Sequence, residues 1–143
     1  MDAHTTHRNT LEEVKVSVKL KLAALWASFM FLYIYVDYFH LYMPGSLRDL
    51  LAGTVFVFDI TQAYILAALV SVTIPALMIF LSVALSAQVS RSANIVVATI
   101  YIPYTLFNMV GEAWIHMAFG ASVEVGLLLL VIRYAWKWPR AET

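Results

Sequence analysis

Four long runs of apolar residues, separated by short polar segments, dominate the chain. An α-helix rises about 1.5 Å per residue, so roughly 20 apolar residues cross a hydrocarbon core near 30 Å thick. The pattern therefore predicts an all-α fold, an integral membrane four-helix bundle. Its spans are expected at residues 22–43, 59–85, 93–117 and 120–136. Because the link between the last two runs is short, those helices are predicted to be antiparallel neighbours.

Shorter segments complete the predicted layout. Valines alternate with lysines before the first run, which indicates a lead-in lying at the cytoplasmic membrane surface. Pro44 and Gly45 end the first run, because this dipeptide breaks a helix. The following residues 46–53 read as a short interfacial helix. The chain thus divides into a polar lead-in, one four-helix domain and a cytoplasmic tail: residues 1–21, 22–138 and 139–143.

Composition supports the membrane assignment. Of the 143 residues, 62% are hydrophobic and 13% charged, whereas a soluble domain has about 45–50% apolar and about 25% charged residues. The net charge of zero gives no sign of a nucleic-acid partner. The absence of cysteine removes disulfides, thiol catalysis and thiolate metal sites together.

The basic residues predict the orientation. Eight of the nine Lys and Arg side chains lie before the first run, between the second and third, or at the end of the fourth: Arg8, Lys15, Lys19, Lys21, Arg91, Arg133, Lys137 and Arg140. Only Arg48 lies on the other side. Since basic residues stay in the cytoplasm, both termini and the 86–93 loop are expected there.

With that orientation, the ionisable and amide side chains inside the runs gather in the outer half. Such residues are costly in a membrane and usually face a bundle interior or a wet cavity. Asn108, Glu112 and His116 follow one another at i, i+4 and i+8, which predicts one stripe on the third helix. The remaining members of this layer are Asp37 and His40 on the first run, Asp59 and Gln62 at the start of the second, and Glu124 on the fourth.

We expect this layer to form an outward-facing polar pocket. The candidate acid–base groups are Asp37, His40, Glu112 and His116, because a carboxylate in a dry pocket can share a proton with a nearby histidine. The expected pocket wall consists of Tyr38, Asp59, Gln62, Asn108, Trp114 and Glu124. Structural alternatives stay open: Asp59 as a helix N-cap, Glu124 at a helix dipole, and the aromatic residues as an interfacial belt.

Two prolines fall within predicted helices. Pro75 frees the carbonyl of Ser71, and Pro103 frees that of Thr99. Ordinary helix irregularity explains both, because neighbouring helices can satisfy the freed groups. Alternatively, kinks at similar depth widen the outer half of the bundle into a pocket.

The preferred function is binding of a hydrophobic small molecule or lipid, with its acid–base conversion left open. The runner-up is a subunit of an oligomeric small-solute or ion transporter or channel, and a third alternative is a non-catalytic structural subunit. A metal site is weighed but not assigned, because di-iron bundles use Glu-x-x-His pairs and the pairs here are Asp37-x-x-His40 and Glu112-x-x-x-His116. No cofactor is identified; the expected partners are the bilayer, the ligand and further copies of the chain.

Several long strings carry a resemblance: LWASFMFLYIYVDYFHLYMPGSL, VFVFDITQ, IPALMIFLS, YIPYTLFN, GEAWIHMAFG and YAWKWPR. Together they resemble a family of small bacterial four-span membrane proteins of unknown function, over roughly residues 11–140. This resemblance implies a multi-pass protein of the bacterial inner membrane. It implies no reaction.

Overall fold

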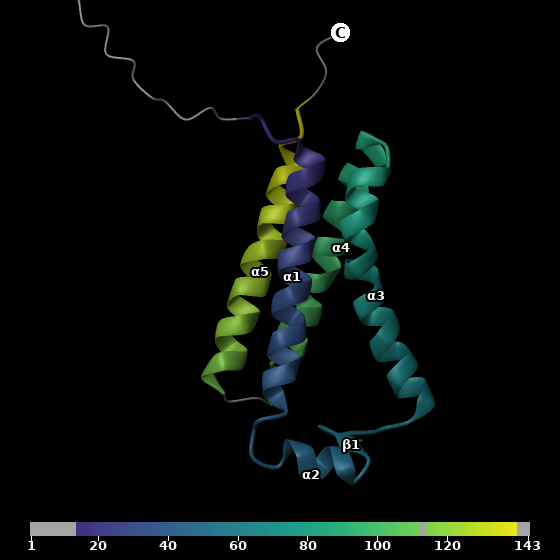
Figure 1. The fold of residues 1–143 in the computed structure, drawn as a ribbon, viewed down its shortest axis with the longest axis vertical. Helices are drawn as coiled ribbons and strands as arrows, with labels where there is room; N and C mark the ends of the chain where they lie inside the picture. Colours follow the sequence, from purple (N-terminus) through teal and green to yellow (C-terminus); the bar gives the residue numbers. More distant parts are fainter. Residues whose placement is uncertain (1–13, 112–113, 140–143) are drawn as a thin grey trace, which may run out of the picture.

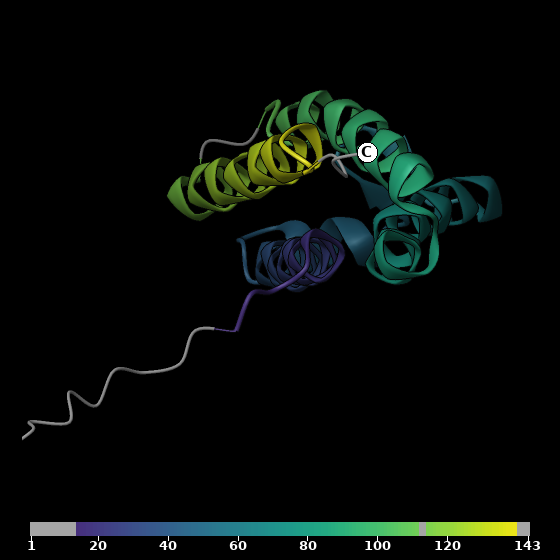
Figure 2. The same ribbon diagram turned by 90° about the horizontal axis from the view of Figure 1, so that it is seen from above.

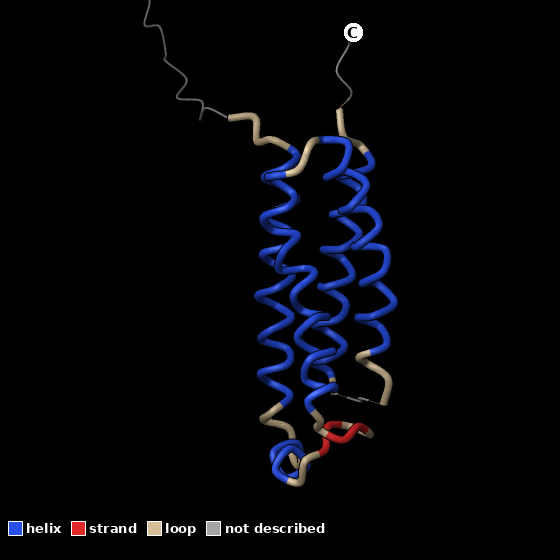
Figure 3. The backbone as a smooth tube through the Cα atoms, turned by 90° about the vertical axis from the view of Figure 1, so that its right-hand side faces the viewer, coloured by secondary structure: helices blue, strands red, loops and turns tan. Residues whose placement is uncertain are grey.

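The structure is a computed structural model that describes residues 14–111 and 114–139. Four long helices run side by side, and a short helix and a two-stranded hairpin follow the first of them (Figures 1 and 3). The elements in chain order are α1 (Val18–His40), α2 (Ser46–Leu51), β1 (Thr54–Val55), β2 (Phe58–Asp59), α3 (Gln62–Ala84), α4 (Ala87–Phe107) and α5 (Ile115–Trp136). The predicted all-helical class is confirmed.

The long helices alternate in direction. We call one end of the bundle the terminal end, because α1 begins there, α5 ends there, and α3 turns into α4 (Figure 1). The opposite end is the hairpin end, where α2, β1 and β2 lie. Helix α1 packs against α3 and α5, and α5 packs against α4. Seen along the bundle, α1 and α3 face α5 and α4 (Figure 2). Helix α3 diverges from α1 toward the hairpin end (Figure 1).

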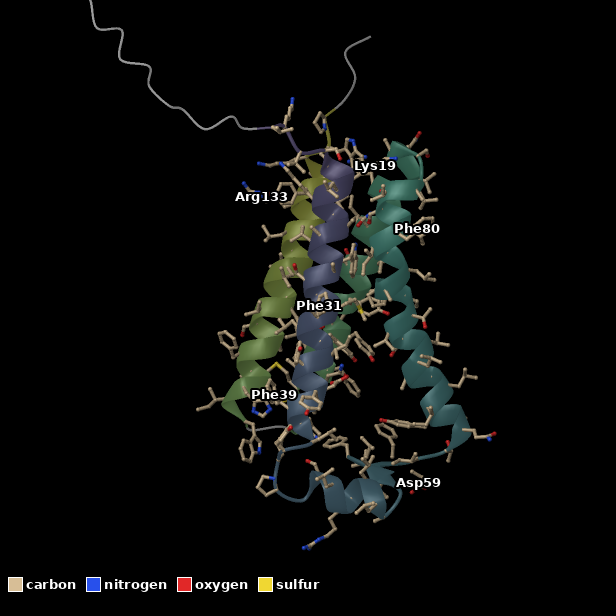
Figure 4. All side chains as sticks on the ribbon, in the orientation of Figure 1. Lys19, Phe31, Phe39, Asp59, Phe80 and Arg133 are labelled. Carbon is tan, nitrogen blue, oxygen red and sulfur yellow. The ribbon has the colours of Figure 1, made fainter. Side chains whose placement is uncertain are left out.

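Three of the described helices are long and apolar enough to cross a membrane: α1, α3 and α5. Helix α4 has 21 residues but is more polar, since it carries Gln88, Arg91 and Asn94 along its first two turns. Large apolar side chains such as Phe31, Phe39 and Phe80 point outward from the bundle (Figure 4). This surface suits a lipid surrounding.

The third predicted span is wrong at its C-terminal end. Helix α4 ends at Phe107, Asn108 is its C-cap, and a turn follows through Gly111. Gly111 has a φ of 88°, and a Cβ there would lie 2.8 Å from the ring of Phe56. Both the backbone conformation and the close approach require glycine. Asn108 and His116 therefore do not share one helix as expected, since His116 lies on α5, and Glu112 lies outside the described residues.

The start of the second predicted span also differs. Residues 54–59 form the β1–β2 hairpin, with Thr54 paired to Asp59, and its turn places Phe56 at a φ of 54°. Helix α3 begins only at Gln62, and its N-cap is Thr61, whose hydroxyl accepts a hydrogen bond from Tyr64 N at 3.1 Å. The N-cap role considered for Asp59 is thus wrong. The predicted short helix is confirmed as α2, and its N-cap is Gly45.

A fully buried polar network joins three helices near the terminal end. The amide of Asn94 on α4 is its centre: Oδ1 accepts hydrogen bonds from Trp26 Nε1 at 2.7 Å and from Ser82 Oγ at 3.1 Å. Its Nδ2 donates to the carbonyl of Ser90 at 2.8 Å. All four side chains are completely buried. Trp26 also packs edge-on against Phe29 and Tyr101, so the network adjoins the apolar core.

Two basic side chains cap the C-termini of neighbouring helices at the terminal end. Lys19 Nζ on α1 donates to the carbonyls of Val83 and Leu85, where α3 ends. Arg91 Nε on α4 donates to the carbonyl of Ala135 at 3.1 Å, in the last turn of α5. Cations at helix C-termini satisfy free carbonyls and complement the helix dipole. From the sequence, these two residues predict only the orientation in the membrane. In the structure they also connect neighbouring helices.

We predict that Asn94→Ala destabilises the bundle. The substitution leaves the Trp26 indole N–H and the Ser82 hydroxyl with one acceptor fewer in a dry interior, which costs about 1–3 kcal/mol for an orphaned group. Thermal unfolding in detergent micelles, followed by circular dichroism, measures the loss. The matched control is Thr99→Ala on the exposed face of α4, expected within about 0.5 kcal/mol of the parent. Equal stability of both variants would contradict the role given to Asn94.

Candidate functional site

A small polar cavity lies between α1, α4 and α5 in the half of the bundle nearest the hairpin end. Its volume is about 30 Å³, which matches the space that one water molecule occupies in the liquid. Three helices contribute three residues each, counting the turn after α4: Tyr33, Val36 and Asp37; Thr105, Asn108 and Met109; Met117, Ala121 and Glu124. Three of the predicted site residues, Asp37, Asn108 and Glu124, are thus brought together.

Glu124 and Thr105 form the deep wall of the cavity. Glu124 on α5 is only 4% exposed, and Thr105 on α4 is 2% exposed. The Thr105 hydroxyl is buried and makes no hydrogen bond of good geometry in the described part of the chain, although the Glu124 carboxyl group lies near enough to interact with it. An orphaned buried hydroxyl costs about 1–3 kcal/mol, so its presence beside a carboxyl group needs an explanation.

Asp37 and Asn108 are the accessible members. Both side chains are exposed, so they stand where the cavity opens to the surroundings of the bundle. His40, the last residue of α1, lies three positions from Asp37 on the same helix face and is half-buried, outside the cavity wall. The predicted pair Asp37 and His40 therefore flanks the cavity, with only the carboxylate lining it.

Asp59 and Gln62, the residues of the second apolar run that were expected to line the cavity, do not line it. Asp59 is exposed on β2, away from the end of α1 (Figure 4). Gln62 opens α3 and lines a separate, open groove of about 470 Å³ with Ile60, Ile65 and Leu69 among its walls. This groove follows one face of α3 and is mostly apolar. The cavity has walls from three helices rather than four, because α3 diverges from the bundle at this end (Figure 1).

The other predicted residues lie outside the cavity wall. Tyr38 is exposed, and its hydroxyl lies 2.8 Å from that of Tyr42; this hydrogen bond raises the pKa of Tyr42 above its ordinary value. Trp114 is the N-cap of α5 and packs edge-on against His116, with ring centroids 6.0 Å apart. The Nε2 atom of His116 is buried without a partner among the described residues. Glu112 lies outside the described residues.

A chain of hydroxyl groups leads from the cavity to α3. The hydroxyl of Tyr33, which lines the cavity, lies 3.4 Å from that of Tyr104, and Tyr104 donates to Ser71 Oγ at 3.0 Å. Tyr101 donates to the carbonyl of Ser71. This is the carbonyl that Pro75 deprives of its helical partner, and a neighbouring helix supplies the missing donor. Both α3 and α4 continue as helices through their prolines.

The cavity chemistry is that of an acceptor-rich site. Two carboxyl groups, the Thr105 hydroxyl and the Asn108 amide face a space too small for a drug-sized ligand, whose pockets measure about 300–1,000 Å³. One water molecule or one comparably small polar group fits. Among the described residues, no three His, Cys, Asp or Glu side chains come close enough together to hold a metal ion.

Sequence reasoning missed Thr105, although a signal was present. Thr105 precedes Asn108 by three residues, so both lie on one face of α4 and its C-cap. A lone threonine in an apolar run is common, because its hydroxyl can bond a carbonyl of the preceding turn, as Thr99 does with Ile95 O at 2.7 Å. Only the structure distinguishes Thr105, whose hydroxyl makes no such bond.

The chain belongs to a family described as Family of unknown function (DUF6326), whose model matches residues 11–143. The predicted resemblance to a family of unknown function is therefore confirmed. No curated protein and no solved structure matches the chain. Any function must accordingly be argued from the cavity itself.

We predict that Gly120→Ala destabilises the protein, because Gly120 lets α1 approach α5 beside the cavity. A Cβ at this position would lie 2.5 Å from Cγ2 of Val36, and a β-branched side chain in a helix has no free rotamer to yield. Overpacking of this kind costs about 1–3 kcal/mol. Thermal unfolding measures the effect.

Gly126→Ala is the matched control on the same helix. A Cβ there meets nothing within 4 Å, so alanine is expected to be neutral or to stabilise by up to about 1 kcal/mol through helix propensity. Adding Val36→Ala to Gly120→Ala should restore stability. A double variant as unstable as Gly120→Ala would show that the Val36 contact is not the cause.

Proposed function

We propose that this member of the Family of unknown function (DUF6326) is a four-helix integral membrane protein whose cavity binds the polar end of a hydrophobic small molecule or lipid. In this proposal α4 crosses the bilayer together with α1, α3 and α5. Both termini lie in the cytoplasm of a bacterium, and the cavity lies in the outer half of the inner membrane.

The observation that carries the proposal is the unpartnered Thr105 hydroxyl beside the buried Glu124. Protein interiors leave few buried polar groups without a partner, and those few mark a bound water, an ion or a functional group. The size of the cavity limits what can enter to a hydroxyl- or amine-sized group. The apolar body of the ligand stays outside, against the exposed apolar faces of the helices.

The proposal gives α4 a lipid-buried setting despite its polar residues. Asn94 and Ser90 are fully buried in the network with Trp26 and Ser82, and the Arg91 side chain reaches the end of α5. Side chains satisfied in this way do not face lipid. The exposed face of α4 includes Val89, Val96 and Ile100, which are apolar.

Single-cysteine labelling tests the number of crossings, because the chain has no native cysteine. If α4 crosses with the other three, Lys15→Cys, Ser86→Cys and Lys137→Cys react from one side of inner-membrane vesicles, and Asp49→Cys reacts from the other. If α4 does not cross, Lys137→Cys and Lys15→Cys label from opposite sides. That outcome would contradict the four-span proposal.

We predict that Thr105→Val weakens ligand binding without weakening the fold. Valine has the shape of threonine but no hydroxyl, and no protein hydrogen bond is lost because Thr105 Oγ1 has none among the described residues. We expect unchanged or higher thermal stability. Affinity should fall about fivefold to tenfold, the equivalent of one hydrogen bond of about 1 kcal/mol or slightly more.

Native mass spectrometry of the detergent-solubilised protein measures this binding, with dodecanol and dodecylamine as probes. At least one probe should bind the parent protein and bind Thr105→Val less. The matched control is Thr99→Val, on the exposed face of the same helix. Absence of binding by both probes would indicate that the cavity holds only water and would overturn the proposed function.

A further inference from the structure

We propose that the polar group taken into the cavity is a primary ammonium, so that the ligand is a long-chain primary amine. This inference rests on the proposed function and specifies its ligand class. Three observations carry it: the charge of the cavity wall, the hydrogen-bonding types that the wall offers, and its volume.

The charge of the wall favours a cation. Asp37 and Glu124 approach the same small space from α1 and α5. In the described part of the chain, no Lys or Arg lines the cavity: Arg48 lies on α2, and the others lie toward the terminal end. His40, one turn beyond Asp37, is the nearest basic side chain on α1. Two carboxylates in a poorly hydrated site repel each other, and a cation bound between them removes that repulsion.

The hydrogen-bonding types of the wall favour a group that only donates. An ammonium has three N–H donors and no acceptor. The cavity presents more acceptors than donors to it: the acceptors are the Glu124 and Asp37 carboxylates, Thr105 Oγ1 and the Asn108 amide oxygen, and the Asn108 NH₂ and the Tyr33 hydroxyl can donate. Thr105 is the independent sign of a missing partner, because its hydroxyl is buried and unbonded among the described residues. One ammonium can bond all three side chains.

The volume sets the size of the cation. A space of about 30 Å³ admits one water-sized group, which an –NH₃⁺ group is. A trimethylammonium or a phosphate group is several times larger and suits this space less well. The site should therefore prefer a primary amine to the choline and phosphate groups of ordinary membrane lipids.

The surroundings of the cavity suit an apolar tail. Asp37 is exposed, so an amine held there has its chain directed out of the bundle. Within a turn or so of the two carboxylates, α1 exposes Ile34 and α5 exposes Phe119 and Val123. A saturated chain lying against these side chains stays in the hydrocarbon of the membrane while its head is held by the carboxylates.

The test compares four dodecyl probes by native mass spectrometry of the full chain in detergent: dodecylamine, dodecanol, dodecyltrimethylammonium and dodecanoate. We expect dodecylamine to bind at least about tenfold more tightly than dodecanol, since hydrogen bonds to charged groups are stronger than neutral ones. Dodecyltrimethylammonium and dodecanoate should not compete. Equal binding of dodecanol, or binding of dodecyltrimethylammonium, would overturn the amine assignment and leave the proposed function standing.

Variants locate the bound amine. Asp37→Asn and Glu124→Gln should each lower dodecylamine affinity about tenfold or more and lower dodecanol affinity by a smaller factor. Asp37 is exposed, so its variant serves even if Glu124→Gln fails to fold. Asp49→Asn, an exposed carboxylate on α2 outside the cavity, is the matched control. An equal loss in Asp49→Asn, or no loss in Asp37→Asn, would place the amine elsewhere. If no probe binds at all, the proposed function fails as well.

Discussion

The need to satisfy every polar group inside an apolar bundle governs this structure. A side chain such as Asn94 is costly beside an apolar core unless its amide is bonded, and both its Oδ1 and its Nδ2 atoms make hydrogen bonds. The same rule explains Ser71, whose carbonyl loses its helical donor to Pro75 and gains Tyr101 in exchange. It also explains Lys19 and Arg91, which bond the free carbonyls at the ends of α3 and α5. Apart from the bond of Asn94 Nδ2 to Ser90 within α4, these bonds cross between helices, so the satisfaction of polar groups also fixes which helices are neighbours.

Two buried side-chain atoms of the described residues break this rule, His116 Nε2 and Thr105 Oγ1, and the second lies in the cavity wall. Thr105 has a buried hydroxyl without a partner in the described part of the chain, one turn from the end of a helix whose other polar side chains are bonded or exposed. Glu124 adds a carboxyl group that is almost fully buried in the same wall. A structural role accounts for the Asn94 network, whereas Thr105 and Glu124 lie near each other without a hydrogen bond of good geometry. A bound group that supplies the missing hydrogen bonds explains both residues at once.

The sequence predicts the parts of this structure that depend on local pattern. The apolar runs locate the long helices, and the polarity of Asp37, Asn108 and Glu124 locates three of the cavity residues. Where the local pattern gives a wrong helix boundary, a contact between residues that are distant in the sequence determines the structure. The turn at Gly111 interrupts a continuous apolar run because Phe56 packs against it, and Phe56 belongs to a hairpin some fifty residues earlier. Asp59 is lost from the site for a similar reason, since the hairpin takes up the residues that were expected to open the second helix. The position of a residue along a helix follows from the sequence, but the tilt of a helix relative to its neighbours does not.

The positions of the two polar networks favour the binding of a ligand over the transport of a solute through a single copy of the chain. The hydroxyl chain from Tyr33 through Tyr104 reaches Ser71 on α3 and stays in the hairpin half of the bundle. The Asn94 network lies near the terminal end. Between them, the described core includes Met78, Ala98 and Phe29, and the Phe29 ring packs edge-on against Trp26 and Tyr101. A solute entering beside Asp37 therefore meets a closely packed apolar layer before any further polar group, and crossing that layer would require the helices to separate. A site that opens on one side and ends against a packed core is suited to binding a small polar group rather than to passing it across the bundle.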